Sequence, residues 1–402
     1  MKFNIWNDFP QKPLPELLDF IVDNRGKTVP TVSQEEACEI VLIATNCIRN
    51  ENLYPVYEKV RYISKETYEK WFRAHPISGD IIFVNKGTPG RICFCPENID
   101  FCIAQDMMAF RVNSSVLYNK YLLAVLRSRE MQEQIRITSV GDTIPHFKKE
   151  FLKELTIPLP PMDVQQIIGD YYFKLSEKIE LNKKINENLH QLIAAYYAEI
   201  FKECEHTAKI SDYADRVFSG GTPTTSNETY WSGEFKWLSS GETSQKYIVD
   251  TEKTITQAGV DNSSTRLAKK YDTVIASAGQ GHTRGQTSML LTDTYINQSI
   301  IVVESERIYM PFIYWNICGR YEELRVISNS NSIRGSLTTK MISAFTSPKA
   351  DITQISRFSE LAWAAIHEIE KNCNEIARLA ALRDTLLPKL MNGEIDVSTA
   401  QI

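Results

Sequence analysis

Long apolar runs are missing from this sequence of 402 residues. None approaches the roughly 18 residues that a membrane-spanning helix requires. The first residues, MKFNIWNDFPQKPLPELL, also lack the uninterrupted apolar segment of a secretory signal peptide. We therefore expect a cytoplasmic protein without a membrane partner.

Closely spaced cysteine pairs are missing as well. No C-x-x-C occurs, although this spacing is typical of zinc sites and redox dithiols. Cys93 and Cys95 stand two apart in a strand-like run, where such residues share one face of a strand. The sequence predicts reduced thiols and no metal site for all eight: Cys38, Cys47, Cys93, Cys95, Cys102, Cys204, Cys318 and Cys373.

Catalytic motifs are equally scarce. Gly26-Lys27-Thr28 lacks the upstream glycine of a phosphate-binding P-loop, and no two histidines stand four residues apart to hold a metal. A methyltransferase needs a glycine-rich cofactor loop and a base-flipping pocket motif, and neither occurs. Scattered Asp and Glu-x-Lys fragments of the nuclease type lie on no convincing strand. We expect a non-catalytic chain that has no cofactor of its own.

Proline and glycine are nearly absent from one long segment. After the prolines at 158, 160 and 161, residues 162–201 contain no proline and only one glycine, Gly169. This composition predicts one long helix. About 38 helical residues at ~1.5 Å each reach roughly 57 Å.

Apolar residues in this segment recur at the a and d spacing of a coiled coil. One series runs through positions 164, 171, 185 and 192, and the other through 168, 175, 189 and 196. The middle heptad places polar residues in these slots, which lowers stability but fixes register. The pattern predicts helix pairing through Ile168, Leu175, Lys178, Asn182, Ile185 and Leu189.

A second amphipathic segment, residues 351–390, is the expected partner helix. Asp351 and Gln354 resemble Asp163 and Gln166 at the start of the first helix, and both pairs are variants of a capping box. The stretch ELNKKINEN at 180–188 also aligns with EIEKNCNEI at 368–376. We expect antiparallel pairing, with Ile366, Ile369 and Cys373 in the seam. The alternative is two unrelated amphipathic helices of one core.

The rest of the chain divides into two globular parts, because 402 residues exceed what one hydrophobic core usually serves. Strand signals at 39–46, 80–84 and 91–95, together with several helix signals, indicate an α+β fold. The expected boundaries are 1–156 for the first domain, 157–204 for the hinge and central helix, 205–348 for the second domain, and 349–402 for the C-terminal helix and tail.

The two globular parts repeat one plan. Leu17-x-Asp19-Phe20 matches Ile210-x-Asp212-Tyr213, and residues 102–105 (CIAQ) match 295–298 (YINQ), both with an offset of 193. The stretches DII at 80–82 and DTV at 272–274 also correspond, with an offset of 192. A nearly constant offset predicts a tandem repeat of domain plus helix, that is, an internal pseudo-two-fold repeat.

Several stretches carry a resemblance to a known family. They are IPLPPMDVQQ, LSEKIELNKKINENL, KGTPGR, CIAQD with the later GDTIPH, SGGTP at 219–223 and LRDTLLPKLMNGEI at 382–395. In this order the chain resembles the specificity subunit of a type I restriction-modification enzyme, and the resemblance covers essentially its whole length.

The resemblance implies a division of labour. Two target recognition domains would each read one half of a bipartite double-stranded DNA sequence, and the paired helices would set the length of the unread spacer. The chain would itself be non-catalytic. It would dock two modification (methyltransferase) subunits and the restriction subunits, which would carry S-adenosylmethionine, ATP and Mg²⁺.

The net charge of −5 argues against a uniformly basic surface, but DNA binding requires positive charge only locally. Base reading requires hydrogen-bonding side chains on loops, with Lys and Arg on phosphates. Arg284 suits guanine, and Gln280 or Gln286 suits adenine. The expected DNA-binding residues are Lys86, Arg91, His146, Lys148 and Lys149 in the first domain, and Gln280, His282, Arg284, Gln286, Asn331 and Arg334 in the second.

Other interpretations remain open for these residues. The loop glycines also suit tight turns. Each lysine also suits a solvated surface position, and His146 also suits a turn after its proline. Gln105 and Gln298 are expected to be buried in strands. For the whole chain, the alternatives are a protein- or glycan-binding scaffold spaced by a coiled coil and, third, a fused nuclease.

Overall fold

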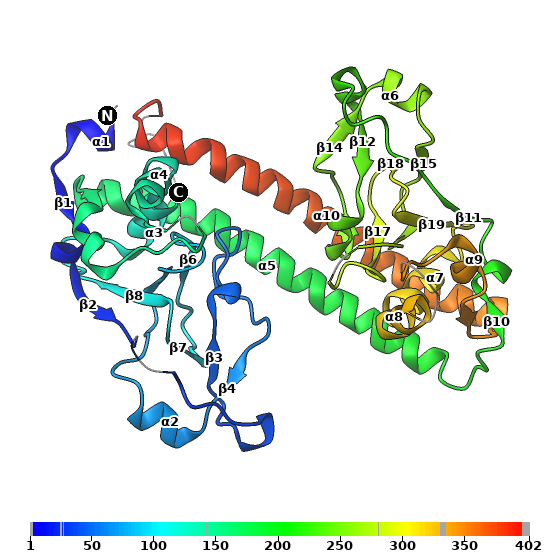
Figure 1. The fold of residues 1–402 in the computed structure, drawn as a ribbon, viewed down its shortest axis with the longest axis horizontal. Helices are drawn as coiled ribbons and strands as arrows, with labels where there is room; N and C mark the ends of the chain where they lie inside the picture. The colour runs from blue at the N-terminus through cyan, green and yellow to red at the C-terminus, as the bar shows by residue number, and fades with distance from the viewer. Residues whose placement is uncertain are drawn as a thin grey trace. The chain divides into compact units, whose positions relative to one another are not determined.

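The structure is a computed structural model that describes residues 3–24, 26, 28–141, 143–279, 281–329 and 335–395. The chain forms two compact units (Figure 1). Unit 1 comprises Met1–Leu181 and Ile376–Ile402, and unit 2 comprises Asn182–Glu375. The unit boundaries thus fall inside the two long helices rather than at their ends.

Unit 1 has an α+β fold built on antiparallel strands. Its strands are β1 (Gln11–Pro13), β2 (Leu18–Val22), β3 (Val41–Ile43), β4 (Arg61–Tyr62), β5 (Ile81–Val84), β6 (Ile92–Phe94), β7 (Phe101–Ile103), β8 (Met107–Val112) and β9 (Thr156–Pro158). Its helices are α1 (Ile5–Asp8), α2 (Lys65–Lys70), α3 (Asn119–Arg127) and α4 (Arg129–Thr138), with short 3-10 turns at η1 (Leu14–Leu17), η2 (Gln34–Glu36), η3 (Thr45–Cys47) and η4 (Lys149–Glu154).

These strands form three sheets. One has the order β2-β8-β5-β6, a second has the order β4-β3-β7 with β3 and β7 parallel, and β1 pairs with β9. Apolar side chains from the two larger sheets, such as Ile43, Ile82 and Ile103, bury one face of each sheet against the other. The opposite face of the first sheet packs through Phe83 and Phe110 on the helices.

Unit 2 repeats this plan. Its strands are β10 (Ala208–Lys209), β11 (Arg216–Ser219), β12 (Trp231–Leu238), β13 (Tyr247–Ile248), β14 (Lys253–Ile255), β15 (Arg266–Ala268), β16 (Thr273–Ala276), β17 (Thr287–Leu290), β18 (Thr294–Ile296), β19 (Ile300–Glu304) and β20 (Thr346–Ser347). Its helices are α6 (Gln257–Asp261), α7 (Met310–Cys318), α8 (Tyr321–Asn329) and α9 (Thr339–Ser343), with 3-10 turns η5 (Ile210–Asp212), η6 (Glu228–Tyr230) and η7 (Ser240–Ser244).

The sheet orders of unit 2 are β11-β19-β16-β17-β13, β14-β12-β18-β15 and β10-β20. Each sheet of unit 1 therefore has a counterpart, and the parallel pair β3/β7 corresponds to β12/β18. Because Ile103 pairs with Ile43 as Ile296 pairs with Leu238, the predicted match of 102–105 with 295–298 is correct. The internal repeat is confirmed.

One predicted correspondence is shifted. Leu14 N donates to Leu155 O, and Ile210 N makes the same bond to Phe345 O, so Ile210 corresponds to Leu14 and not to Leu17. The similar spacing of the two Asp-aromatic pairs is accidental. Asp19 and Phe20 lie on strand β2, whereas Asp212 ends a 3-10 turn.

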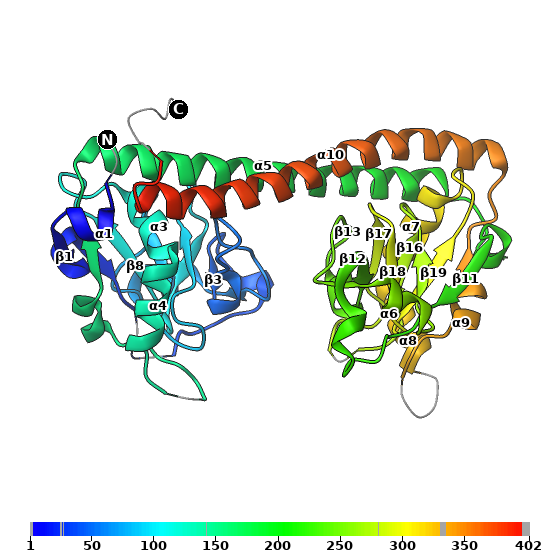
Figure 2. The ribbon, with the colours of Figure 1, turned by 90° about the horizontal axis from the view of Figure 1, so that it is seen from above.

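Two long helices, α5 (Met162–Ile200) and α10 (Ile352–Met391), pass through both units. In unit 1 the first half of α5 packs on the last turns of α10, with Tyr172 and Leu387 in one cluster. In unit 2 the end of α5 packs on the start of α10, where the Tyr196 and Phe358 rings stack. The helices are therefore antiparallel within each unit, as Figures 1 and 2 show.

The buried face of α5 differs in phase from the predicted seam. Ile168 and Asn182 are buried, as are Ile366 and Ile369 on α10, whereas Leu175, Ile185, Leu189 and Cys373 are half-buried. Lys178, expected in the seam, is exposed, and its neighbour Ile179 is buried instead. The buried residues on this side of α5 are Gln165, Tyr172, Ile179, Asn186 and Ile193, one position later than predicted.

The centre of the helix pair is polar. Asn372 Nδ2 donates to Asn186 Oδ1 at 2.9 Å, and Asn182 Nδ2 donates to Glu375 at 2.8 Å. His190 lies one turn further along α5, where burial lowers its pKa to about 4, so the ring is neutral at pH 7. This run of buried polar groups satisfies the expectation that the seam is interrupted in its middle.

Trp363 on α10 makes its contacts inside unit 2. Its ring packs edge-on against Tyr271 at 4.8 Å, and the Arg307 guanidinium lies 4.1 Å above it.

Among the described residues, no helix has both the length and the apolar composition of a membrane span.

The repeat places an aspartate at the start of equivalent strands in different electrostatic surroundings. Asp80 is buried and accepts two hydrogen bonds from Arg111, at 3.1 and 2.9 Å. Asp272 is equally buried, but the residue equivalent to Arg111 is Glu304. Burial, and secondarily the charge of Glu304, raise the pKa of Asp272 to about 7.

This raised pKa predicts a pH dependence of unit 2. Because the pKa of Asp272 is higher in the folded than in the unfolded chain, its contribution to stability is complete below about pH 4 and is lost as the pH rises to about 7. Thermal unfolding of wild type and Asp272→Asn at pH 5 and pH 8 tests this. On going from pH 5 to pH 8, the free energy of unfolding of wild type should fall relative to that of Asp272→Asn by on the order of 2 kcal/mol.

Asp261→Asn, at the exposed end of α6, is the control for loss of a carboxylate and should show no such gain. A difference between Asp272→Asn and wild type that stays constant with pH would contradict the assignment.

Candidate nucleic-acid interface

Three loops of unit 1 meet at one end of the β2-β8-β5-β6 sheet. They are residues 85–91 after β5, residues 104–106 between β7 and β8, and residues 139–141 and 143–147 after α4. Asn85 joins all three, since its N donates to Asp106 O at 2.9 Å and its O accepts from Phe147 N at 2.7 Å. We call these residues the unit 1 loop cluster.

Val140 and His146 form an isolated antiparallel bridge, and we call the described residues 140, 141 and 143–146 the hairpin. Val140 and His146 exchange two backbone hydrogen bonds, at 3.0 and 2.8 Å. The turn between them requires glycine at 141, because this residue has φ +96° and a Cβ there would lie 3.0 Å from the Ile144 carbonyl oxygen. A further bond, from Gly87 N to Pro145 O at 2.9 Å, fixes the hairpin to the loop after β5.

A pocket of about 560 Å³ lies on one side of this hairpin. Asn85 lines it with a buried side chain, whose Oδ1 has no hydrogen-bond partner in the described part of the chain and whose Nδ2 lies 3.4 Å from His146 Nε2. Asp106 has φ +69°, a strained conformation for a residue other than glycine. The lining is almost entirely polar: Asp23, Gly26, Arg73, Asn85, Lys86, Gln105, Asp106 and His146.

A larger pocket of about 890 Å³ lies on the other side, between the hairpin and α4. It includes Arg129 and Arg136 of α4, Gln132 between them, and the turn Gly87-Thr88-Pro89. Arg136 forms an ion pair with Glu133 at 2.5 Å, and the Arg136 side chain is largely exposed. The hairpin therefore stands between two polar depressions, each with at least one arginine.

The structure brings together some of the residues predicted for unit 1. Lys86 and His146 are bridged backbone to backbone and line the same pocket. Arg91 lies at the far end of the 85–91 loop and is half-buried. Lys148 pairs with Glu150 at 3.5 Å and Lys149 with Asp23 at 3.3 Å, so both are engaged in local ion pairs.

Unit 2 builds an equivalent cluster from the loops after β16, between β18 and β19, and before α9. Ser277 takes the place of Asn85, since its N donates to Ser299 O and its O accepts from Leu337 N, both at 2.8 Å. We call the described residues of these loops, 277–279, 281–286, 297–299 and 335–338, the unit 2 loop cluster. The predicted residues Gln280, Asn331 and Arg334 lie outside the described residues.

The remaining predictions for unit 2 have different surroundings. His282 has an exposed side chain, and its carbonyl accepts from the Tyr321 hydroxyl at 2.8 Å. Gln286 is half-buried and accepts from the Thr243 hydroxyl at 3.3 Å. Both lie on the segment that joins β16 to β17.

Arg284 makes hydrogen bonds within unit 2. Its guanidinium donates to the Gly335 carbonyl and to the Asn329 side chain, and its Nε is buried without a described partner. These bonds link Arg284 to Asn329 and Gly335, and they use two of the five N–H donors of the guanidinium. The base contact expected of Arg284 stays a prediction.

Two residues of the loop clusters were misjudged from sequence. Gln105 and Gln298, expected to be buried in strands, are exposed at equivalent turns, β7–β8 and β18–β19. The Thr222 hydroxyl donates to Gln298. Two apolar runs separated by only three residues are the signal that indicates such a turn.

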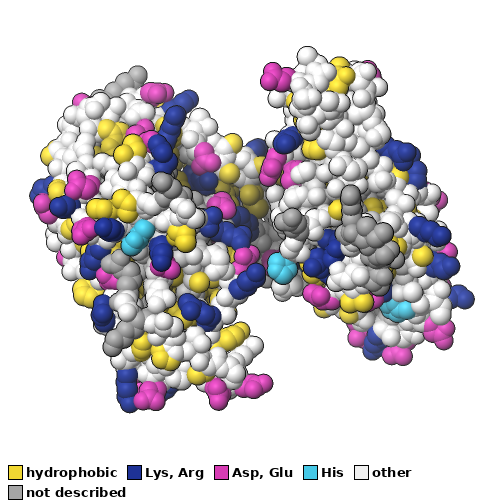
Figure 3. Space-filling model, viewed as in Figure 1, with side chains coloured by type: hydrophobic (Ala, Val, Ile, Leu, Met, Phe, Trp, Pro, Cys, Tyr) yellow, Lys and Arg dark blue, Asp and Glu magenta, His cyan; other side chains and the backbone are white. Residues whose placement is uncertain are grey.

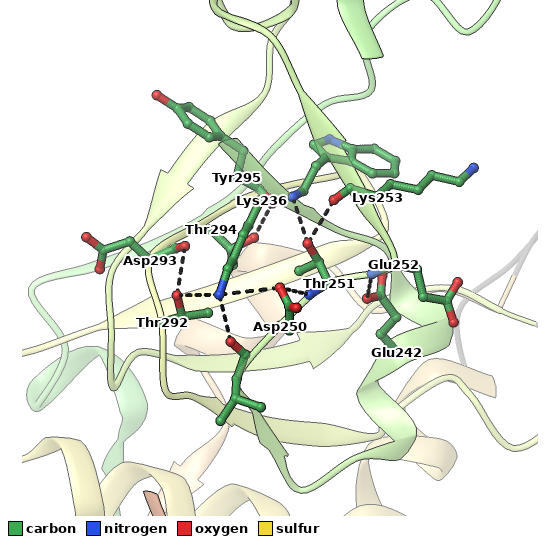
Figure 4. A network of polar contacts seen from close by, with 12 residues as sticks. Lys236, Glu242, Asp250, Thr251, Glu252, Lys253, Thr292, Asp293, Thr294 and Tyr295 are labelled. Carbon is green, nitrogen blue, oxygen red and sulfur yellow. Dashed lines mark hydrogen bonds and ion pairs between the residues drawn. The ribbon is translucent and has the colours of Figure 1, made fainter. Parts of the chain in front are cut away.

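Figure 4 shows a polar network that positions the η7 turn of unit 2. Lys236 Nζ donates to Val249 O at 2.8 Å and pairs with Asp250 at 3.4 Å. Glu242 accepts from Ser239 N at 2.9 Å and from Glu252 N at 2.8 Å. The network is structural, and it fixes the turn from which Thr243 contacts Gln286.

Charge is distributed in patches. On the face drawn in Figure 3, Lys and Arg side chains occur in groups interspersed with Asp and Glu.

Within the described ranges, no three His, Cys, Asp or Glu side chains are grouped in a way that suits a metal ion. All eight cysteines are free thiols, and burial raises the pKa of Cys93 strongly.

Comparison with known proteins gives a consistent result. A protein-family model, described as the type I restriction modification DNA specificity domain, matches residues 12–191. The HindI specificity subunit of Haemophilus influenzae is 21% identical, over 79% of this chain and 86% of its own length. The MjaIX specificity subunit of Methanocaldococcus jannaschii is 21% identical, over 69% of each chain.

A solved structure shares the fold. The S subunit of a type I restriction-modification system from M. genitalium covers 96% of both chains with a TM-score of 0.59, at 17% identity. The repeated domains, the paired helices and these matches agree: residues 12–191 match the type I restriction modification DNA specificity domain, and the chain is similar to specificity subunits and shares the fold of a solved one.

Proposed function

We propose that each unit reads one half of a bipartite DNA target and that α5 and α10 set the length of the unread spacer. One observation carries the proposal. Both units present a loop cluster at the same end of equivalent sheets, and the loops are joined by equivalent backbone hydrogen bonds at Asn85 and Ser277. A chain that uses one frame twice is suited to binding two similar objects, such as two segments of a DNA duplex.

The chemistry of the clusters suits duplex DNA. Sequence is read by hydrogen bonds to base edges, whereas phosphate contacts supply affinity and orientation. Gln105 and Gln298 are exposed, and a glutamine side chain pairs with adenine N6 and N7. Lys86, with its exposed side chain, suits a phosphate contact. His282 and Gln286 are the further candidates in unit 2.

Differences between the clusters suit different half-sites. Asn85 in unit 1 is replaced by Ser277 in unit 2, although the surrounding backbone bonds are the same. The pocket that contains Asn85 also contains His146 and Arg73. Because the frame is shared and the loop side chains differ, the two units would read different bases in the same way.

The partners belong to this proposal as well. Two modification subunits and the restriction subunits would dock on the chain and would carry S-adenosylmethionine, ATP and Mg²⁺. Two copies of the modification subunit match the internal repeat. The complex would act in the cytoplasm, where the DNA that it reads is located.

Replacing the two equivalent glutamines tests the assignment of half-sites. Gln105→Ala should relax base preference in one half-site only, and Gln298→Ala in the other, by about 1–3 kcal/mol at one base pair each. Binding of the chain with its modification subunits would be measured on duplexes substituted base by base, after mapping methylated positions in the host genome. Each variant is the control for the other. Effects of one variant on both half-sites would refute reading by separate units.

Salt dependence tests the phosphate contact of Lys86. Lys86→Ala should weaken binding to all duplex sequences about equally and lower the slope of log K against log salt by about 1. Lys12→Ala is the matched control, because Lys12 is exposed on the β1–β9 ribbon, outside the loop cluster. The prediction fails if Lys86→Ala and Lys12→Ala have the same slope.

Helix length tests the spacer. Four residues inserted at equivalent central positions of both helices add about 6 Å at ~1.5 Å per residue. We expect the unread spacer to lengthen by about one or two base pairs, at 3.4 Å per pair, with unchanged preferences in both half-sites. The same insertion in α5 alone is the control and should abolish specific binding. Altered half-site preferences in the double insertion would count against the spacer role.

A further inference from the structure

The loop after β16 in unit 2 is longer than its counterpart after β5 in unit 1. Gly90 N donates to Val84 O at 3.0 Å, and Gly285 N donates to Ala276 O at 2.9 Å, so both loops close in the same way. Both glycines have φ +89°. Because five residues separate Val84 from Gly90 and eight separate Ala276 from Gly285, the unit 2 loop has three additional residues.

The helices α4 and α8 lie against the ends of these loops in equivalent places. A Cβ on Gly90 would meet α4 at 3.1 Å, and a Cβ on Gly285 would meet α8 at 3.4 Å. The side chains that these atoms would meet are Gln132 and Ile135 in α4, and Tyr321 and Leu324 in α8. The contacts match in order with an offset of 189, and by this offset Arg136 of α4 corresponds to Arg325 of α8.

Two side chains of α8 hold the backbone of the longer loop. Arg325 Nη1 donates to Gly281 O, and the Tyr321 hydroxyl donates to His282 O, both at 2.8 Å. The acceptors are backbone carbonyl groups, so these bonds fix the path of the loop and leave its side chains available. The His282 side chain is accordingly exposed.

The corresponding side chains of unit 1 are used differently. Gln132 Nε2 donates to Gly90 O at 2.9 Å, at the end of the shorter loop. Arg136 Nε donates to Glu133 at 2.8 Å, within its own helix. Of the two equivalent arginines, the one that bonds to a loop backbone therefore belongs to the unit with the longer loop.

We propose that Arg325, together with Tyr321, positions the longer loop of unit 2 for base reading. This inference rests on the proposed function and names residues that determine specificity without contact to DNA. A loop that is already held in its bound shape loses less conformational freedom on binding. Arg325 thus acts through the backbone of Gly281 and His282, and it is a positioning residue.

Arg325→Ala tests this role. Binding of the chain with its modification subunits would be measured on the target duplex and on duplexes substituted base pair by base pair. We expect about fivefold weaker binding to the target, the ratio for one net hydrogen bond, and weaker base discrimination in one half-site only. Because a positioning residue neutralises no phosphate, the slope of log K against log salt should not change.

Three further variants complete the test. Tyr321→Phe removes only the hydroxyl and should weaken discrimination in the same half-site as Arg325→Ala. Arg325→Lys keeps a cationic donor and should restore most of the discrimination. Arg136→Ala is the matched control at the equivalent position, and it should leave base discrimination unchanged in both half-sites. Equal thermal unfolding of Arg325→Ala and Arg136→Ala would separate the effect from a loss of folding.

Two results would overturn the inference. One is unchanged base discrimination in Arg325→Ala and Tyr321→Phe. The other is a salt slope for Arg325→Ala that falls by about 1, which would make Arg325 a phosphate contact. Both leave the proposed function intact. A wild-type complex that binds no duplex specifically would instead refute the proposed function, and this inference with it.

Discussion

The packing of each domain against both long helices is the constraint on which the rest of the structure depends. In unit 1, Leu387, Leu390 and Met391 of α10 enter the same hydrophobic cluster as Phe3 and Tyr121, far away in sequence. Gly393 lies against the Phe3 backbone, where a Cβ would be 2.1 Å from the Phe3 carbonyl oxygen. The core of the first domain is therefore incomplete until the end of the chain is present.

Unit 2 obeys the same constraint from the other direction. Phe201, just after α5, and Phe358 on α10 pack edge-on at 5.6 Å, and both belong to the core cluster of the second domain. Residues of both long helices complete the domain cores, so helix pairing and domain folding are energetically coupled. Apolar burial is concentrated toward the domains, and the central part of the pair carries amides. Such amides add little stability but favour one register, which a spacer requires.

Sequence patterns were sufficient for the frame. The scarcity of proline and glycine, the heptad spacing and the constant offset identify both helices and the repeat. The phase of the seam was off by one residue at Lys178 and Ile179, because an α-helix of 3.6 residues per turn drifts from a strict heptad, and the domains, as well as the partner helix, decide which face is buried. Local pattern alone does not contain that second surface.

The loops were harder to predict for a related reason. The sequence predicts a base contact for Arg284 but not the hydrogen bonds that its guanidinium makes to Gly335 and Asn329. Gln105 follows an apolar strand, yet it is exposed, because the chain turns at Asp106 with a positive φ. Both outcomes depend on which distant segment lies beside the residue, and periodicity carries no information on that.

The repeat itself shows how one frame tolerates different loops. Asn85 and Ser277 occupy the same junction, and the backbone bonds that join the loops are the same although the side chains differ. Because backbone groups carry the frame, side chains at the loop tips are free to change without loss of the sheet or the helices.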